Sequence, residues 1–391
     1  RRGARAEHRA SFRRKPKEGE INCEVETLLQ KCPSCKGGLG APHSWHERYS
    51  WDIPIPIEPI ITRYRIAQYQ CGKCKEWCQG MPKGLVSKSP FGINIMLFVL
   101  HEKYLGRATD KHIRESLQML YGLVLGKGTI HQILNRSAEL FGGSYEGIKQ
   151  ALREGKYLHA DETGWRVEGA NWYAWSFSNE KAILYTIENT RGHGVPEKIL
   201  KDFKGVVVRD GYQGYDKLPN EHQICLIHLL RNTKERAEMP GASGEMKRLH
   251  EQLKWFVRMI RKRHKRCHSH KQRIALHGRM EKVLEKFWKN IKYHDKDAEK
   301  IRSWWLERRH QHLLTFLKYE DVPWENNAEE RAIRPIVIKR KVCGGSRSKR
   351  GAERESINAS CIATFIKQGK SLFAEIPAIL DQAKKENYKK P

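Results

Sequence analysis

The sequence predicts a mixed α/β protein, and three observations support this class. Short apolar or β-branched runs precede Asp161 and Asp210, which is typical of strands that end in an exposed carboxylate. Stretches before and between these acids place apolar residues at helical spacing. Two Cys-x-x-Cys pairs near the amino end add a small metal-binding region ahead of the α/β core.

The amino-terminal part is expected to form a basic arm and then a zinc ribbon. Residues 1–20 are basic and lack the apolar core of a signal peptide, so we expect them to be disordered. Residues 21–86 hold two knuckles that can share one tetrahedral Zn²⁺, with the ligands Cys32, Cys35, Cys71 and Cys74. The alternative is a set of ordinary reduced cysteines, since Cys23 and Cys78 show that not every thiol here needs a metal.

Residues 87–154 are expected to form a helical DNA-binding region. Apolar residues recur at helical spacing in residues 93–104, 113–121 and 129–141. The turn Gly126-Lys-Gly-Thr129 suits a helix-turn-helix, with Thr129 near the N-cap and Lys127 and Arg136 available to DNA. A plain three-helix packing module is the competing interpretation.

The residues expected to carry chemistry are three carboxylates within residues 155–340. Asp161 follows the short, largely apolar stretch of residues 156–160 and precedes a predicted turn at Gly164. Asp210 ends the buried run Val206-Val-Val-Arg, and two β-rich runs before it, residues 171–178 and 182–188, form a predicted hairpin. Glu330 is expected one turn into a helix that Asn326 and Asn327 can cap.

Two strand-end aspartates and one helix glutamate suit a two-metal phosphoryl-transfer site. Such a set can hold two divalent cations roughly 3.5–4 Å apart, one at the attacking oxygen and one at the leaving oxygen. Taken singly, each acid is more simply explained as a turn former, a helix cap or a solvated side chain. The sequence around the acids decides between these interpretations.

That sequence resembles the transposases of the insertion sequence 66 family, whose motifs occur here in the family's order. They are His159-Ala-Asp-Glu-Thr-Gly-Trp165, Val208-Arg-Asp-Gly-Tyr-Gln-Gly-Tyr-Asp216, Cys225-Leu-Ile-His228 and Asn326-Asn-Ala-Glu-Glu-Arg-Ala-Ile-Arg-Pro335. The resemblance implies a ribonuclease-H-like core in which Asp161, Asp210 and Glu330 bind Mg²⁺ or Mn²⁺. It favours Glu330 because this residue directly precedes Arg331, whereas Glu329 stands where the family usually has alanine.

The resemblance also implies a reaction and partners. Enzymes of this kind hydrolyse a DNA strand at the element's end and then use the freed 3′-hydroxyl to attack target DNA. We therefore expect double-stranded DNA as the partner, self-association when two ends are brought together, and accessory proteins of the same element. Expected DNA contacts near the glutamate are Arg331, Arg334, Lys339 and Arg340. For Arg331 and Arg334 the competing view is that they only cover a helix face.

Three further segments complete the predicted organisation. Cys225 and His228 lie three residues apart and share a helix face if residues 223–236 are helical, so we expect a structural role near the site. Amphipathic basic helices are predicted in an insertion at about residues 240–320, where residues 258–271 hold many cations and no acid. Residues 341–391 are expected to form a basic loop and a helix from about residue 356 to residue 368.

Composition agrees with a nucleic-acid partner. The 391 residues carry 74 Lys and Arg against 45 Asp and Glu, a net charge of +29 that attracts polyanions. No long apolar run predicts a membrane span, and a cytoplasmic, nucleoid-associated protein is the default expectation. The sequence thus predicts a DNA transposase. The alternatives are a catalytically silent zinc-dependent DNA-binding protein and a metal-dependent nuclease without strand transfer.

Overall fold

The computed structural model divides the chain into two compact units, residues 1–58 and residues 59–391. It describes residues 15–21, 23–26, 34–38, 41–42, 44, 46–47, 49–50, 58–65, 68–70, 73–74, 77–79, 86 and 89–387. In the first unit, a single 3₁₀ turn spans Glu18–Glu20, and exposed Lys15 pairs with Glu47 at 2.7 Å. Two of the predicted zinc ligands, Cys32 and Cys71, lie outside the described residues.

The second knuckle lies between two short strands. Strands β1 (Gln68–Gln70) and β2 (Trp77–Gln79) pair antiparallel, with Gln70 opposite Trp77. Cys74 lies in the connection between them and is exposed. A hairpin around a Cys-x-x-Cys pair is the local geometry that a zinc knuckle uses, so the prediction of zinc stays open.

Four helices precede the sheet. They are α1 (Ile93–Tyr104), α2 (Asp110–Tyr121), α3 (Lys127–Leu140) and α4 (Gly142–Arg153). Thr109 caps α2 through its side chain, and Gly122 ends that helix at a φ of 62°. Gly126 is the N-cap residue of α3, and Thr129 lies in its first turn, near the N-cap as expected. Apolar side chains of these helices share one hydrophobic core with the sheet, so they do not form a separate module.

The sheet has five strands in the order β5-β4-β3-β6-β7. They are β3 (Tyr157–Val167), β4 (Ala170–Ser178), β5 (Ile183–Glu188), β6 (Val206–Arg209) and β7 (His222–Ile224). Strands β3, β4 and β5 are antiparallel, as the predicted hairpin requires, whereas β6 pairs parallel to both β3 and β7. The short helix α5 (Gly194–Ile199) precedes β6. This mixed sheet is consistent with a ribonuclease-H-like core.

Strand β3 is longer than the sequence indicates. The predicted turn at Gly164 is wrong, because Gly164 pairs with Tyr173 and the strand turns only at Glu168 and Gly169, both with positive φ. Asp161 therefore lies inside a strand and not at its end. A side chain at position 164 would meet the Arg340 guanidinium at 3.2 Å, so the glycine permits a close approach instead of a turn.

Two helices cover the sheet near its β5 edge. Helix α10 (Asn327–Cys343) continues through Pro335 and packs on β3 and β4, and α11 (Lys349–Lys367) packs on β5. Along α11, three hydroxyls accept hydrogen bonds from backbone N–H groups of the edge strand, at Thr364, Ser360 and Ser356. This pairing satisfies an otherwise open strand edge. Helix α11 starts before the predicted residue 356 because Ser348 caps it, accepting from the backbone N–H of Gly351, and α12 (Leu372–Asn387) follows it.

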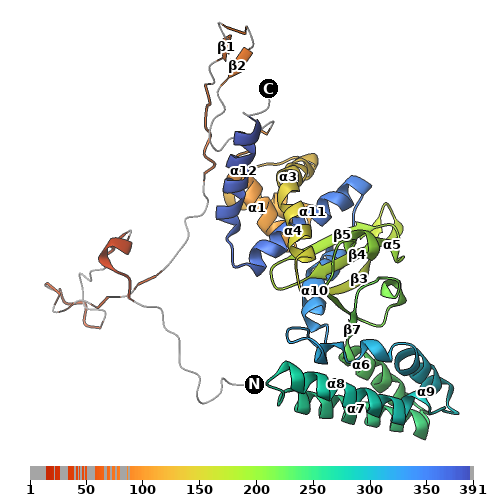
Figure 1. Ribbon diagram of the computed structural model, residues 1–391. Coiled ribbons are helices and arrows are strands. Elements are labelled where there is room, and N and C mark those ends of the chain that lie inside the picture. Colours follow the sequence, from red (N-terminus) through yellow and green to blue (C-terminus); the bar gives the residue numbers. More distant parts are fainter. Residues whose placement is uncertain are drawn as a thin grey trace. The chain divides into compact units, whose positions relative to one another are not determined.

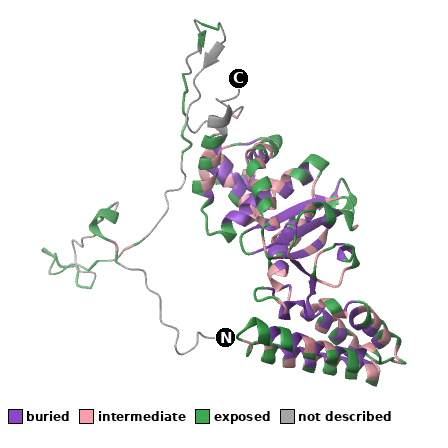
Figure 2. Cartoon of the chain, viewed as in Figure 1, coloured by how far each residue is buried: buried purple, intermediate pink, exposed green. Residues whose placement is uncertain are grey.

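The insertion between β7 and α10 has a hydrophobic core of its own, which extends to Val206 and Val208 of the sheet. It contains α6 (Leu226–Ala237), α7 (Gly244–His264), α8 (His270–Leu284) and α9 (Lys296–Ile301), with π-helical turns at Glu285–Lys289 and Arg302–Glu307. Figure 1 shows these helices gathered beyond β7, and Figure 2 shows buried residues concentrated in the sheet.

Within the described residues, every helix is too short or too polar to cross a membrane.

Candidate catalytic site

Asp161 lies in β3, and Asp210 directly follows the neighbouring parallel strand β6. His159 of β3 is opposite Val208 of β6, so two further residues along each segment bring Asp161 level with Asp210. Side chains alternate along a strand, which puts both carboxylates on one face of the sheet. Ser176 of β4 lies directly opposite Asp161 and shares that face. The structure therefore brings the two predicted aspartates together.

Negative charge is concentrated around Asp161. Burial raises the pKa of Asp161 to about 8, and the nearby carboxylates of Glu162, Asp210 and Glu329 act in the same direction. A backbone N–H, that of Glu162, donates to Asp161 Oδ1 at 2.9 Å. Asp210 Oδ1 accepts from the backbone N–H of Tyr212 at 2.8 Å. Crowded carboxylates of this kind favour a bound cation, which would offset their mutual repulsion.

The two neighbouring glutamates of α10 have opposite surroundings. Glu329 is fully buried and accepts hydrogen bonds from the hydroxyls of Ser176 and Ser178. Burial raises the pKa of Glu329 to about 7, against the effect of these two donors.

Glu330 is about one-third exposed and faces α6. Its Oε1 lies 3.3 Å from His228 Nε2 and 3.3 Å from both terminal nitrogens of Arg231. Across the described residues, no three His, Cys, Asp or Glu side chains are grouped closely enough to hold a metal ion. The structure thus brings the two aspartates together, whereas Glu330 contacts α6 and does not form a group of three with them in the described residues.

Asn326 fixes the start of α10. It is the N-cap residue, as predicted, but its side chain makes no capping hydrogen bond because it bonds to the sheet. Asn326 Oδ1 accepts from His159 Nδ1 at 2.7 Å, and its Nδ2 donates to the carbonyl of Ala160 at 3.0 Å. Burial lowers the pKa of His159 to about 4, so the ring is neutral and carries its proton on Nδ1. The helix with both glutamates is thereby tied to the strand with Asp161.

Cys225 contributes to the same anchor. The backbone N–H of Asn326 donates to Cys225 Sγ at 3.2 Å, and burial raises the pKa of this thiol. Cys225 precedes α6 as its N-cap residue, so the predicted shared helix face with His228 is wrong. Cys225 holds the start of α10, whereas His228, one turn into α6, contacts Glu330.

One group of residues near the aspartates was not singled out from the sequence. Glu162 accepts from Arg191 Nη2 at 2.6 Å and from the Tyr215 hydroxyl at 2.7 Å. The Arg191 guanidinium lies 3.9 Å from the ring centre of Tyr212, whose backbone binds Asp210. Glu162 directly follows Asp161, so it points to the opposite face of β3, and this adjacency was the only sign in the sequence that could have identified it. Its bond to Glu162 and its contact with Tyr212 hold Arg191 beside Asp210.

The predicted DNA-contacting cations differ in accessibility. Lys127, Arg331 and Arg334 are exposed, and Arg136 is partly buried. Lys339 is buried and pairs with Glu355 at 2.5 Å, and burial lowers its pKa to about 8, so it cannot reach DNA in this conformation. Arg340 donates to the carbonyl of Gly164 at 2.5 Å and to Thr163, which commits its guanidinium to the sheet.

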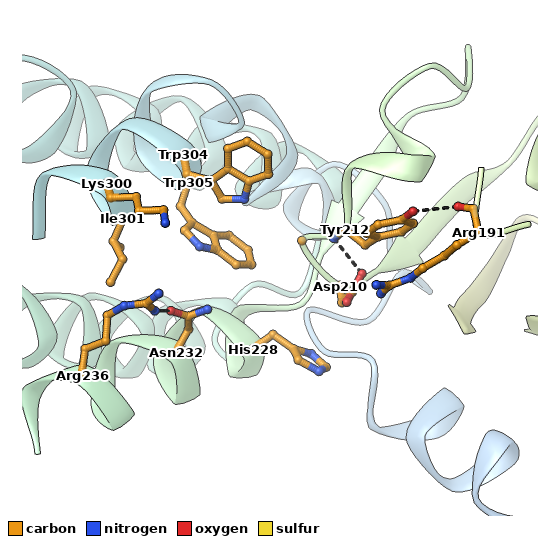
Figure 3. A pocket seen from close by; sticks show the side chains of 11 residues that line it. Arg191, Asp210, Tyr212, His228, Asn232, Arg236, Lys300, Ile301, Trp304 and Trp305 are labelled. Atoms are coloured by element: carbon orange, nitrogen blue, oxygen red, sulfur yellow. Dashed lines mark hydrogen bonds between the residues drawn. The ribbon is translucent and has the colours of Figure 1, made fainter. Parts of the chain in front are cut away.

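A cleft of about 410 Å³ opens beside Asp210 (Figure 3). Its lining comes from Arg191 and the loop Asp210–Tyr212 after β6 on one side and from α6, α9 and the π-helical turn Arg302–Glu307 on the other. Asp210 is the only acidic residue that lines it, among the residues the structure describes.

Comparison with known proteins agrees with this arrangement. Residues 88–354 match the model of the family described as "Transposase IS66 family", which is more than half of the chain. A relative in Sinorhizobium fredii (strain NBRC 101917 / NGR234), named "Uncharacterized protein y4hP", is 21% identical over 402 residues, covering 90% of this chain and 70% of the relative. The matched residues include both aspartates, both glutamates and the Cys-x-x-His element. The chain belongs to the IS66 family of transposases, and this membership implies DNA transposition and suggests phosphoryl transfer.

Proposed function

We propose that this chain is an Asp-Asp-Glu transposase that cleaves DNA strands and joins them to new DNA by a metal-dependent reaction. The observation that carries the proposal is the level placement of Asp161 in β3 and of Asp210 directly after the neighbouring parallel strand β6. Glu330 lies in the first turn of α10, which packs on β3 and β4, and we expect it to join the two aspartates when the metal binds.

The chemistry of these side chains fits a divalent cation. Asp161, Asp210 and Glu330 offer only carboxylate oxygens, which Mg²⁺ and Mn²⁺ prefer over nitrogen or sulfur ligands. The carboxylates gathered around Asp161 raise its pKa through their negative charge, and a cation would relieve that repulsion. When bound, a pair of such ions activates an attacking oxygen and stabilises the leaving oxygen. Glu330 would complete the ligand set after leaving Arg231.

In the proposed reaction, a water oxygen bonds to the phosphorus at the element's end and the P–O3′ bond breaks, leaving a 3′-hydroxyl. That hydroxyl then attacks a target phosphodiester, forming one P–O bond as another breaks. In this reaction, the protein's side chains orient the DNA strand and keep the metal-binding carboxylates in place. Because two element ends take part, we expect at least two copies to associate during the reaction.

The insertion offers a surface for the DNA backbone. A groove of about 660 Å³ runs between α6 and α7, and its lining includes two acids, Glu238 and Glu251, and more cations, namely Arg231, Lys234, Lys247, Lys254, Arg258 and Arg261. Spaced cations of this kind bind phosphates without reading sequence. Arg331 and Arg334 on α10 are exposed and extend the positive charge toward Glu330. These residues would hold the strand while the carboxylates act on it.

We also infer Zn²⁺ at the Cys-x-x-Cys pairs. The β1–β2 hairpin around Cys74 supports this inference, because zinc knuckles commonly lie in such turns. Metal analysis of the purified full chain should give about one zinc per chain, and Cys74→Ser should lower it, whereas exchange of the buried Cys361 for serine should not. An unchanged zinc content in Cys74→Ser would contradict the assignment.

The test of the main proposal is strand cleavage and joining on a duplex that carries the native element's end. The full chain should give joined product with Mg²⁺ or Mn²⁺ and none without a divalent cation. Asp210→Asn should abolish both steps, because it removes an anionic ligand with little change of shape. Asp202→Asn, the same exchange at an exposed aspartate shortly before β6, should react like the native chain.

Each other outcome selects a different function. Cleavage without joining would indicate a nuclease, and DNA binding with neither reaction would indicate a silent DNA-binding protein. Full activity in Asp210→Asn would overturn the assignment of the site.

A further inference from the structure

The cleft beside Asp210 has the composition of a nucleotide site. Its lining combines indole rings with cations, and Figure 3 shows Trp304 and Trp305 across the opening from Arg236 and Asn232. Its volume of about 410 Å³ lies within the roughly 300–1,000 Å³ of clefts that enclose small ligands. A duplex is too wide for such a space, whereas a single nucleotide is not.

The wall formed by Trp305 is fixed to the loop that carries Asp210. A Cβ atom at Gly211 would lie 2.6 Å from Trp305 Cη2, so the indole packs directly on the glycine backbone. Trp305 is only 5% exposed. The cleft therefore keeps a constant position relative to the carboxylate proposed to act on DNA.

Trp304 supplies an aromatic surface that is held in place and still accessible. The guanidinium of Arg309 lies 3.8 Å from its ring centre, and Arg309 is itself paired with Asp216. Trp304 is half-buried and is one of the residues that line the cleft. A preordered ring of this kind can stack with any base, because every base has a π-face.

Cations surround this aromatic surface. Lys300 is exposed on one side of the cleft, and Arg236 and Arg191 lie on the others. His228 also faces the cleft, and its Nδ1 is buried without a hydrogen-bond partner in the described structure. This nitrogen is therefore available to a polar group of a ligand.

We propose that this cleft takes up one unpaired nucleotide of the DNA, next to the phosphate that the carboxylates act on. The base stacks on Trp304, and the flanking phosphates contact Lys300 and Arg236. This inference rests on the proposed function, since it deepens the description of the same site. Holding one base out of the duplex would fix the position of the neighbouring phosphate at Asp210.

The test compares three dye-labelled DNA duplexes, by fluorescence anisotropy with the full chain and without divalent cation. One is fully paired, one has a single unpaired thymidine, and one has an unpaired abasic sugar at the same place. The native chain should bind the unpaired thymidine about fivefold to a hundredfold more tightly than the abasic duplex, since only the base differs. Trp304→Ala should abolish this preference, Trp304→Phe should retain part of it, and Trp255→Ala, at an exposed tryptophan of α7, should leave it unchanged.

A second measurement does not depend on the folding of a variant. A duplex with an unpaired 5-iodouracil, irradiated with the native chain, should cross-link to the peptide that contains Trp304. Equal affinity for the thymidine and abasic duplexes, or cross-links elsewhere, would overturn the inference while metal-dependent cleavage still supported the proposed function. A base preference without any cleavage would retain the cleft and refute the proposed reaction. Failure to bind any duplex would overturn both.

Discussion

The two sides of α10 differ in what their residues contact, and the neighbours Glu329 and Glu330 show this most clearly. The buried side consists of residues that face the sheet and α11, namely Glu329, Ala332, Ile333, Ile336 and Lys339. The other side carries Glu330, Arg331 and Arg334, which are partly or fully exposed. Both sides carry charge, but on the buried side each charge has a committed partner.

The buried side of α10 anchors the helix, whereas the exposed side carries the residue proposed to take part in the reaction. Glu329 is bound by two serines of β4 and Lys339 by Glu355, so neither can move without leaving a buried group unpaired. Glu330 has only longer contacts, at 3.3 Å, with two side chains of α6 that can rotate away. A metal ligand that must change its contacts when the ion binds is therefore expected on the exposed side of α10. The comparison yields four predictions, ordered by the size of the expected effect.

The first prediction contrasts the two glutamates in activity. Glu330→Gln should lower metal-dependent strand cleavage by about a thousandfold, because loss of one anionic ligand removes several kcal/mol of transition-state stabilisation. Glu329→Gln should stay within about tenfold of the native rate, since an amide still accepts a hydrogen bond from a serine. The measurement is single-turnover cleavage of an end-containing duplex. The reverse order of the two effects would make Glu329 the third ligand.

The second prediction concerns the anchor at Asn326, with Asn327 as its matched control. Asn326→Ala should lower the free energy of unfolding by about 2–5 kcal/mol, because it leaves His159 Nδ1 and the carbonyl of Ala160 buried and unpaired. Asn327 bonds only to the side chain of Glu325 and is partly exposed, so Asn327→Ala should cost less than about 1 kcal/mol. Urea unfolding of both variants gives the comparison. Equal losses would show that Asn326 is an ordinary helix cap.

The third prediction concerns pH and Glu329. Its folded-state pKa of about 7 lies above the ordinary value of 4.5, so the folded protein binds this proton more tightly than the unfolded chain. The stability contributed by Glu329 is therefore complete below pH 4.5 and is lost as the pH rises to about 7, by up to about 1.4 kcal/mol per pH unit.

Glu329→Gln has no titrating group at this position, which isolates the effect. Between about pH 5 and about pH 7, urea unfolding of the native chain should show a steeper decline in stability than that of the variant. Parallel pH profiles would mean that the serine hydrogen bonds keep the carboxylate ionised throughout this range.

Local patterns were enough to predict that strands precede both aspartates and that a helix carries the glutamates, although not how far β3 extends. The β-branched run before Asp210 and the two runs of the β4–β5 hairpin form the strands that were expected. The family motifs directed attention to Asp161 and Asp210, which the structure brings together. These features depend on neighbours in the chain, which a single sequence displays directly.

The features that were missed depend on partners far away in the chain. Glu329 is buried because Ser176 and Ser178, more than 150 residues earlier, supply its donors. Lys339 was predicted to contact DNA, but it is paired with Glu355 on the following helix. Gly164 was predicted to form a turn, because residue spacing does not show that Arg340 approaches the strand at this position. In each case, a tertiary contact determines the surroundings of the residue, and the local sequence does not show that contact.

The last and smallest prediction tests the exposed side of α10 with two arginines of the same helix. Arg334→Gln should weaken binding to duplex DNA only a few-fold, and it should reduce the slope of log affinity against log salt by about 1, because one phosphate contact is lost. Arg340→Gln should leave that slope unchanged, since its guanidinium is bound to Gly164 and Thr163, and should instead lower the stability. Anisotropy titrations over a range of salt concentrations measure both slopes. A reduced slope in Arg340→Gln would mean that DNA draws this arginine out of the sheet, so that the two sides of α10 differ only in the free protein.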